Sequence, residues 1–178
     1  MGAFYDEVNK PGMCFGDDSG VITLQPLNAG HEEFLFKLFV ECRPDLDWIN
    51  GVDGGTKAGI IRQQFICEQE QMKSLCPGAD YLAVILDGEL VGRIFVDFDT
   101  EAYRILAIGL LQGYRRKGLG MKLVTAVKDG AARVGKQVQL RVAWFNRPAQ
   151  AFYERLGFRL VEDTGDGFEM RWIPPVID

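Results

Sequence analysis

Apolar residues in the first third of the chain recur mostly at helical spacing. Residues 21–25 predict a short strand, and Asn28 can cap a helix that follows and ends at Pro44. A second helix is predicted from about Thr56 to Leu75, where Pro77-Gly78 stops it. The loop between the two helices, residues 45–59, is rich in glycine and aspartate.

The period changes after residue 80. Residues 81–86 and 89–96 predict a hairpin, because Asp87-Gly88 adopts the positive φ of a two-residue turn at little cost. The run 103–111 is apolar almost throughout, which is typical of a central strand covered on both faces. The remaining predicted elements are a helix at 118–134, a strand at 137–142, a helix at 146–156, and strands at 158–161 and 168–172.

The predicted order of elements is β-α-α-β-β-β-α-β-α-β-β. It indicates an α/β (α+β) fold, in which one mixed sheet carries helices on both faces. We expect one domain at residues 21–178, preceded by an N-terminal arm at residues 1–20.

Composition narrows the classes of function. The net charge of −5 argues against a dedicated nucleic-acid binder, which usually carries a basic surface. Four cysteines without a Cys-x-x-Cys pair, and one histidine, do not supply a zinc site. No signal-like N-terminus and no apolar run of membrane-spanning length is present, so we expect a cytoplasmic protein without a membrane partner.

The segment between the apolar strand and the helix at 118–134 carries the clearest chemical signal. It contains Arg115, Arg116, Lys117, Gly118, Leu119 and Gly120. A helix N-terminus offers unpaired N–H groups and a partial positive charge, and the two glycines let backbone approach an anion closely. The segment therefore predicts a phosphate site, although a helix start with solvated basic residues is an alternative reading.

Two common phosphate motifs do not fit this segment. The Gly-Lys-Ser/Thr ending of a Walker loop is missing, and Leu123 stands where a dinucleotide motif needs its third glycine.

Further along, the run 146–158 contains Asn146, Tyr153, Gly157 and Phe158. Here the chain resembles the GCN5-related N-acetyltransferase (GNAT) superfamily. The phosphate motif of that family, Arg/Gln-x-x-Gly-x-Gly/Ala, matches Arg115, Gly118 and Gly120, and its Asn…Tyr-x-x-x-Gly-Phe element matches the second run. The motifs cover roughly residues 80–173, with Gln112 where the family often has proline.

The resemblance implies the GNAT fold, with about seven mostly antiparallel strands and splayed central strands, and acetyl-CoA as co-substrate. It implies that Ile108, Gly109 and Leu110 pair with the pantetheine arm, and that the Leu110 N–H stabilises the oxyanion. The N–H groups of the segment from Arg116 to Met121 hold the pyrophosphate in such proteins. Arg115 supports this loop or the 3′-phosphate, and Asn146 binds pantetheine or braces the splayed strands.

The resemblance also implies that Tyr153 protonates the leaving thiolate, because a phenol with a pKa near 10 can donate at neutral pH. An aromatic packing role beside Phe152 is the alternative. For a general base, the sequence offers Glu101 and Asp99, with Asp97 nearby, although such acids are often only solvated.

The expected activity is acetyl transfer from acetyl-CoA to a primary amine of a small molecule or peptide. A non-catalytic acyl-CoA sensor or scaffold and an interaction protein with an empty cleft are the alternatives. The loop at 44–59 and the second helix are expected to wall the acceptor site, where Asp45, Asp47, Trp48 and Asp53 could attract a cation. A homodimer through the C-terminal strands is possible within such a family.

Overall fold

The computed structural model describes residues 20–43, 46, 51, 53–98 and 101–175. In this part of the chain, seven strands form one sheet with the order β1-β2-β3-β4-β5-β7-β6. The β4–β5 pair is parallel and the other neighbouring pairs are antiparallel. The predicted fold class and element order are therefore confirmed. In chain order, the elements are β1 (Ile22–Pro26), the 3-10 helix η1 (Ala29–His31), α2 (Glu32–Cys42), α3 (Gly54–Leu75), β2 (Asp80–Leu86), β3 (Glu89–Phe98), β4 (Ala102–Leu110), the 3-10 helix η3 (Gln112–Tyr114), α4 (Leu119–Arg133), β5 (Gln137–Ala143), α5 (Arg147–Arg155), β6 (Arg159–Asp163) and β7 (Gly167–Trp172).

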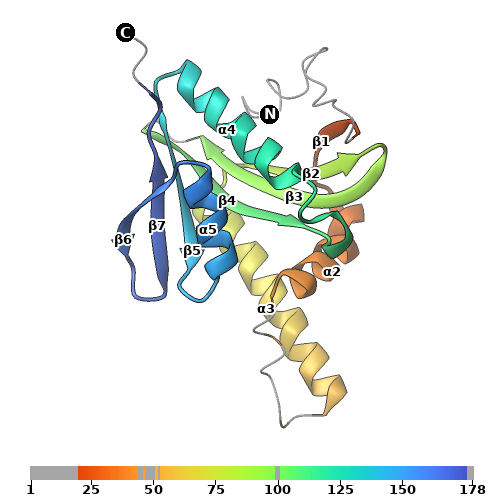
Figure 1. The fold of residues 1–178 in the computed structure, drawn as a ribbon. Helices are drawn as coiled ribbons and strands as arrows, with labels where there is room; N and C mark the ends of the chain where they lie inside the picture. Colours follow the sequence, from red (N-terminus) through yellow and green to blue (C-terminus); the bar gives the residue numbers. More distant parts are fainter. Residues whose placement is uncertain (1–19, 44–45, 47–50, 52, 99–100, 176–178) are drawn as a thin grey trace.

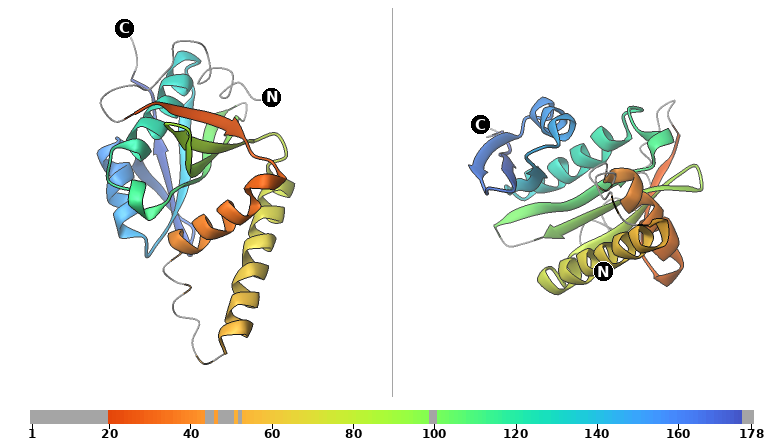
Figure 2. Two further views of the ribbon diagram at one scale, coloured as in Figure 1. Left: turned by 90° about the vertical axis from the view of Figure 1, so that its right-hand side faces the viewer. Right: turned by 90° about the horizontal axis from the view of Figure 1, so that it is seen from below.

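The sheet lies between two helical layers. Helices α4 and α5 cover one face, and α2 and α3 lie on the other, as the view from below in Figure 2 shows. The main core belongs to the sheet and the α4/α5 layer, with Leu123, Val124 and Val127 of α4 fully buried against it. A smaller apolar cluster, which includes Phe39 and Phe65, joins α2 to α3. Among the described residues, no helix is long and apolar enough to cross a membrane.

The start of α3 explains one of the acidic residues in the loop between the first two helices. The Asp53 carboxylate accepts hydrogen bonds from the backbone N–H groups of Gly55 and Thr56 at 3.0 and 3.1 Å. It also accepts one from the Thr56 hydroxyl, and these bonds, the hydroxyl bond first, lower its pKa. Asp53 therefore caps a helix rather than standing free for an amine. Asp45, Asp47 and Trp48 lie outside the described residues.

The central strands separate halfway along their length. Strand β4 pairs with β5 only from Ala102 to Ile105, although both strands continue beyond that ladder. At the same level Leu106 is an extra residue in β4, because Phe95 of β3 faces Ala107 while Val96 faces Ile105. A bulge bends and twists its strand, so it accounts for the divergence of β4 from β5. The expected burial of the run 103–111 on both faces is correspondingly wrong in its middle, where residues 106–108 are half-buried.

A tight turn connects α5 to β6 (Figure 1). The N–H of Phe158 donates to the Tyr153 carbonyl and that of Gly157 to the Glu154 carbonyl, both at 3.0 Å, which is the Schellman pattern. Gly157 has φ +86°, and a Cβ there would meet the Trp172 ring at 3.4 Å. The Gly-Phe pair thus ends α5 and places Phe158 in the core, where it is completely buried.

Candidate active site

Past Ile105, the edge of β4 that faces away from β3 pairs with no other strand. The N–H of Leu111 donates to the Val91 carbonyl at 2.9 Å, so Leu111 faces β3. Hydrogen-bonding direction alternates along an antiparallel strand, and Leu110 and Ile108 therefore turn their N–H and C=O groups away from β3. Beyond Ile105 the β5 ladder has ended, so these groups face the opening between the two strands.

Beyond that edge, η3 and a short loop lead into α4, and the loop has an unusual backbone. Arg116 and Gly118 both have positive φ, +60° and +82°, with Lys117 between them. Gly118 is the N-cap of α4, and its carbonyl accepts the first bond of the helix from Lys122 N–H at 3.0 Å. The N–H groups from Gly118 to Met121 consequently have no acceptor within the helix. This is the geometry of an anion site.

Gly120 lies where α4 meets α5. A Cβ at this position would touch the Phe152 ring at 3.5 Å, which is ordinary contact. Phe152 is adjacent to Tyr153, so the second sequence motif is brought to the helix start that carries the first.

Arg115 holds the loop to its surroundings. Its Nε donates to the Leu110 carbonyl at 2.8 Å, and an Nη donates to the Glu41 carbonyl of α2 at 3.0 Å. The same Nη lies 3.4 Å from the Cys42 thiol. Of the two roles expected for Arg115, this arrangement serves support of the loop.

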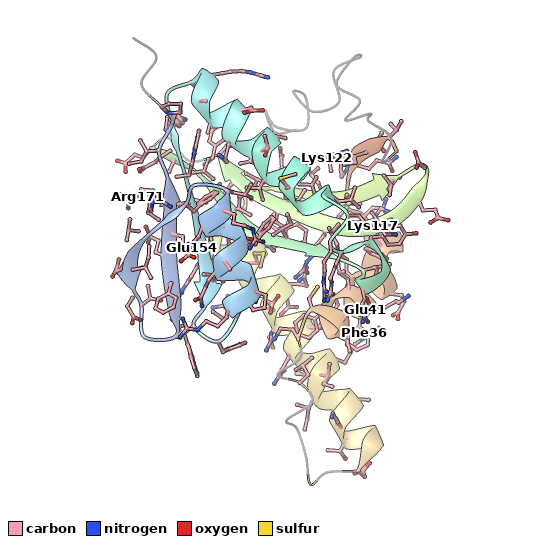
Figure 3. All side chains as sticks on the ribbon, viewed as in Figure 1. Phe36, Glu41, Lys117, Lys122, Glu154 and Arg171 are labelled. Carbon is pink, nitrogen blue, oxygen red and sulfur yellow. The ribbon has the colours of Figure 1, made fainter. Side chains whose placement is uncertain are left out.

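The charges around the loop are arranged by neighbouring elements. The Glu41 carboxylate accepts the Gln112 N–H at 2.9 Å, which brings the C-terminal end of α2 to this corner. The Lys117 ammonium lies 5.3 Å from the centre of the Tyr114 ring. Figure 3 labels Glu41 and Lys117, which come from α2 and from the loop. Arg116 and Lys117 are exposed, so their charges are available to an anion.

Tyr153 lies on the buried side of α5, packed edge-on against the rings of Phe152 and Phe158. It is 7% exposed, and burial raises its pKa to about 12. The expected value near 10 is thus too low. The phenol is therefore protonated at neutral pH, where it can donate a proton.

The side chain of Asn146 has a structural role. Its Oδ1 accepts the Ala149 N–H at 3.2 Å and so caps α5. Gln150, one turn later, is buried and was not anticipated from the sequence. Its Nε2 donates to the carbonyls of Ala143 and Trp144 at 3.0 and 2.9 Å, which fixes the turn between β5 and α5. A glutamine at this spacing from a cap gives no sequence signal of burial.

The acidic candidates for a general base lie elsewhere. Glu101 is exposed and immediately precedes β4, whereas Leu110 ends that strand. Nine residues of strand separate them by roughly 30 Å, so the structure does not bring Glu101 to the β4 opening. Asp97 faces Arg104 in the register of β3 and β4, on the same side of the bulge as Glu101. Asp99 lies outside the described residues.

A groove of about 830 Å³ lies between α2, the C-terminal half of α3 and β2. Leu35, Phe65 and Tyr81 are among its lining residues, and it includes none of the predicted coenzyme A residues. Helix α3 thus walls a groove, but a different one from the opening beside β4.

Comparison with known proteins agrees with this geometry. The family model described as "Acetyltransferase (GNAT) family" matches residues 33–158. Among curated proteins, no sequence matches the chain.

Three solved structures share the fold at low identity. The PaiA N-acetyltransferase of Thermoplasma acidophilum, solved with coenzyme A, is 19% identical with a TM-score of 0.64, over 85% of this chain and 98% of that one. An acetyltransferase of Thermus thermophilus is 20% identical with a TM-score of 0.62, over 85% and 96%. Naa50 of Arabidopsis thaliana, in complex with a bisubstrate analogue CoA-Ac-MVNAL, is 18% identical with a TM-score of 0.54, over 85% and 97%.

The family model spans well over half of the chain, and it includes the β4 edge, the loop before α4, and α5. These are the elements that carry the free N–H groups at the start of α4 and the unpaired edge of β4. The chain belongs to the GNAT acetyltransferase family.

Proposed function

We propose that the protein transfers an acetyl group from acetyl-CoA to a primary amine of a small molecule or a protein, by direct attack in a ternary complex. The observation that carries the proposal is the junction of two open features. The edge of β4 at Ile108 and Leu110, which pairs with no other strand, leads through η3 and a short loop to the helix start whose N–H groups have no intrahelical partner.

The residues present fit coenzyme A. The N–H groups from Arg116 to Met121, with positive φ at Arg116 and Gly118, suit its pyrophosphate. Arg116 and Lys117 add charge that favours the phosphates. Ile108, Gly109 and Leu110 offer a strand edge to the amide groups of pantetheine, in the manner of an added strand. We also assign Arg115, Leu119, Asn146 and Tyr153 to this coenzyme A site.

Bound acetyl-CoA supplies the activated acyl group, and the chain supplies positioning and charge stabilisation. The Leu110 N–H points into the opening and donates to the oxygen on which negative charge develops during attack by the amine. The amine must be neutral when it attacks, so its proton leaves to solvent or to a base. Glu101 is too far along β4 to take that role directly.

Tyr153 completes the proposed reaction. Because its pKa is about 12, the hydroxyl carries its proton at neutral pH. It donates this proton to the departing sulfur, which would otherwise leave as a thiolate. The alternative role, packing against Phe152 and Phe158, involves the ring and does not compete with proton donation by the hydroxyl.

The ligands of two similar structures support the proposal of a ternary complex. One contains coenzyme A, and the other contains an analogue that links coenzyme A through an acetyl group to the peptide MVNAL. Such a linked molecule mimics donor and acceptor bound together.

The test is a screen of acceptors with acetyl-CoA, in which release of the free thiol is followed. Polyamines, aminoglycosides, amino acids and peptides should be included, and the protein should turn over at least one class. Acetyl-CoA binding without thiol release from any amine would favour a sensor or scaffold. Failure to bind acetyl-CoA in calorimetry would contradict both readings.

A further inference from the structure

Arg93 is a charged residue within an otherwise apolar stretch of β3. Residues 90–96 contain no other charge, and Arg93 is 7% exposed. Its neighbours in the sheet are Ala83 on β2 and Gly109 on β4. Burial of a guanidinium is costly unless hydrogen bonds satisfy its five N–H groups.

The protein satisfies this guanidinium only in part. Nη2 lies 3.5 Å from a carboxylate oxygen of Glu68 on α3, and the guanidinium carbon lies 4.9 Å from the centre of the Phe95 ring. The other oxygen of Glu68 is 3.3 Å from Arg43, so the carboxylate is divided between two guanidiniums. An ideal charged pair would be bidentate, at about 2.8 Å.

The second terminal nitrogen of the Arg93 guanidinium lacks a hydrogen-bond acceptor in the described part of the chain. Nη1 of Arg93 is buried and has no hydrogen-bond partner among the described residues. A buried N–H of a charged group is unfavourable when it has no acceptor. An acceptor oxygen placed at Nη1 would remove this penalty.

The position of Arg93 connects this nitrogen with the proposed reaction. Gly109, its neighbour in the sheet, lies between Ile108 and Leu110 in the free edge of β4. On the face covered by α2, the Cys42 sulfur lies 3.2 Å from where a Gly109 Cβ would be. The charge of Arg93 also acts on the Cys42 thiol, whose pKa burial raises. Arg93 thus lies on the α2/α3 side of the β4 edge, opposite Tyr153 and α5.

Two further polar side chains, those of Arg43 and Glu68, connect Arg93 with the surface. The side chains of Arg43 and Glu68 are 36% and 34% exposed, whereas that of Arg93 is 9% exposed. The three side chains therefore form a row from solvent to the neighbourhood of Gly109.

We propose that Arg93 is a specificity-determining residue that binds a carboxylate of the acceptor amine through Nη1. This inference rests on the proposed acetyl transfer and names the acceptor class, an amine that also carries a carboxylate. A carboxylate matches the fork of a guanidinium, and it would replace the weak 3.5 Å contact with Glu68. The ammonium of the same molecule is then held within reach of the β4 edge.

The experiment uses matched acceptors with the full-length protein. Glycine, β-alanine and γ-aminobutyrate vary the distance between amine and carboxylate, and their amides and the corresponding alkylamines lack the charge. The wild type should show a higher kcat/KM for at least one carboxylate than for its amide. Arg93→Met, which keeps an apolar stem, should lower this ratio by roughly tenfold or more, as loss of a charged hydrogen bond predicts. The KM for acetyl-CoA should change little.

A second variant guards against a folding defect. Glu68→Gln keeps the shape of the side chain and removes the competing carboxylate, so it should preserve or raise the preference for the carboxylate. Thermal unfolding of both variants shows whether they are folded. Equal rates for acid and amide in the wild type, an undiminished preference in Arg93→Met, or a lost preference in Glu68→Gln would overturn the inference.

Failure of the acetyl-transfer proposal is recognised separately. If no amine releases thiol from acetyl-CoA, that proposal fails, and the role of Arg93 is read from calorimetry of the same acids with the coenzyme A-loaded protein. Binding of one acid to the wild type, with loss in Arg93→Met, still supports the carboxylate site. No binding to the wild type refutes it.

Discussion

Burial determines the chemical state of Tyr153, the residue placed at the end of the proposed reaction. Its hydroxyl belongs to a side chain packed between two aromatic rings, and no nearby cation offsets the loss of water among the causes of its shift. Burial therefore opposes ionisation of the phenol, which keeps the proton that it is proposed to donate. Two predictions separate its chemistry from its packing.

Replacement of Tyr153 by phenylalanine keeps the ring and removes the proton. We expect kcat to fall roughly tenfold or more, the lower range for a positioned proton donor. Calorimetry should show that acetyl-CoA still binds. An unchanged kcat in steady-state assays would remove Tyr153 from the mechanism and leave it a packing residue.

The same residue should affect stability at high pH. Its pKa of about 12 in the folded protein lies above the ordinary value near 10 in an unfolded chain. The contribution to stability is therefore complete below about pH 10 and is lost as pH rises toward 12. Between pH 8 and 11 the wild type should lose about 1.4 kcal/mol more free energy of unfolding than Tyr153→Phe. Parallel denaturant titrations would disprove the assignment if the two proteins lost stability equally.

Gly120 can be tested by two substitutions of different size. The Cβ of Gly120→Ala meets Phe152 at an ordinary distance, so this variant should fold and bind coenzyme A nearly as the wild type does. Gly120→Glu brings a negative charge to the free N–H groups. It should weaken the Kd for coenzyme A by roughly a hundredfold or more, because like charges in a binding site cost several kcal/mol. Unchanged calorimetric titrations for Gly120→Glu would rule out the phosphate site.

At the scale of elements, the site depends on how β4, α2 and the loop before α4 are joined. Arg115 connects β4 to α2, because its guanidinium donates hydrogen bonds to the carbonyls of Leu110 and Glu41. The bulge at Leu106 makes the second contribution, since it turns the end of β4 away from β5. Neither feature touches the proposed amine, yet both shape the opening.

Arg115→Ala should therefore destabilise the fold as well as the site. It leaves two carbonyls without their donor, and we expect a loss of roughly 1–3 kcal/mol in the free energy of unfolding. Lys117→Ala is the control, since Lys117 is exposed and should change stability by less than about 0.5 kcal/mol. Coenzyme A binding by Lys117→Ala should weaken and become less sensitive to salt. Equal stability of the two variants in urea titrations would contradict the role given to Arg115.

At the scale of the whole molecule, the proposed ligand bridges elements from both halves of the chain. The phosphate site belongs to α4, the strand edge to β4, and the supporting contacts reach α2. Ligand binding to such a junction should stabilise the folded protein as one unit. The bound ligand would connect the two clusters of the core, one between the sheet and α4 and the other between α2 and α3.

Acetyl-CoA should accordingly raise the Tm in a concentration-dependent manner. At a hundred times the Kd, a ligand specific for the folded state adds about 2.7 kcal/mol. Thermal scans with acetyl-CoA, and with Gly120→Glu as the non-binding control, measure the effect. A Tm that did not move for the wild type, at saturating acetyl-CoA, would contradict binding to the folded protein.

The sequence by itself determined the order of the elements, the glycine-bearing loop before α4 and the end of α5. These features follow from local rules: hydrophobic period, turn residues, and glycines such as Gly118 and Gly157, which both have positive φ in the structure. Local patterns of this kind are decided by residues close together along the chain.

Only the tertiary structure decided where the chemical groups meet. The apolar run at β4 gave no sign of the extra residue Leu106, because a bulge depends on register with β3 and not on residue type. Glu101 was a plausible base until the direction of β4 placed it at the far end of the strand. The sequence shows Arg93 as a charge in an apolar strand. Its pairing depends on Glu68 of α3, 25 residues earlier in the chain, which contacts Nη2 and leaves Nη1 without a partner among the described residues. Burial and pairing of this kind arise from packing between distant segments, which no local pattern encodes.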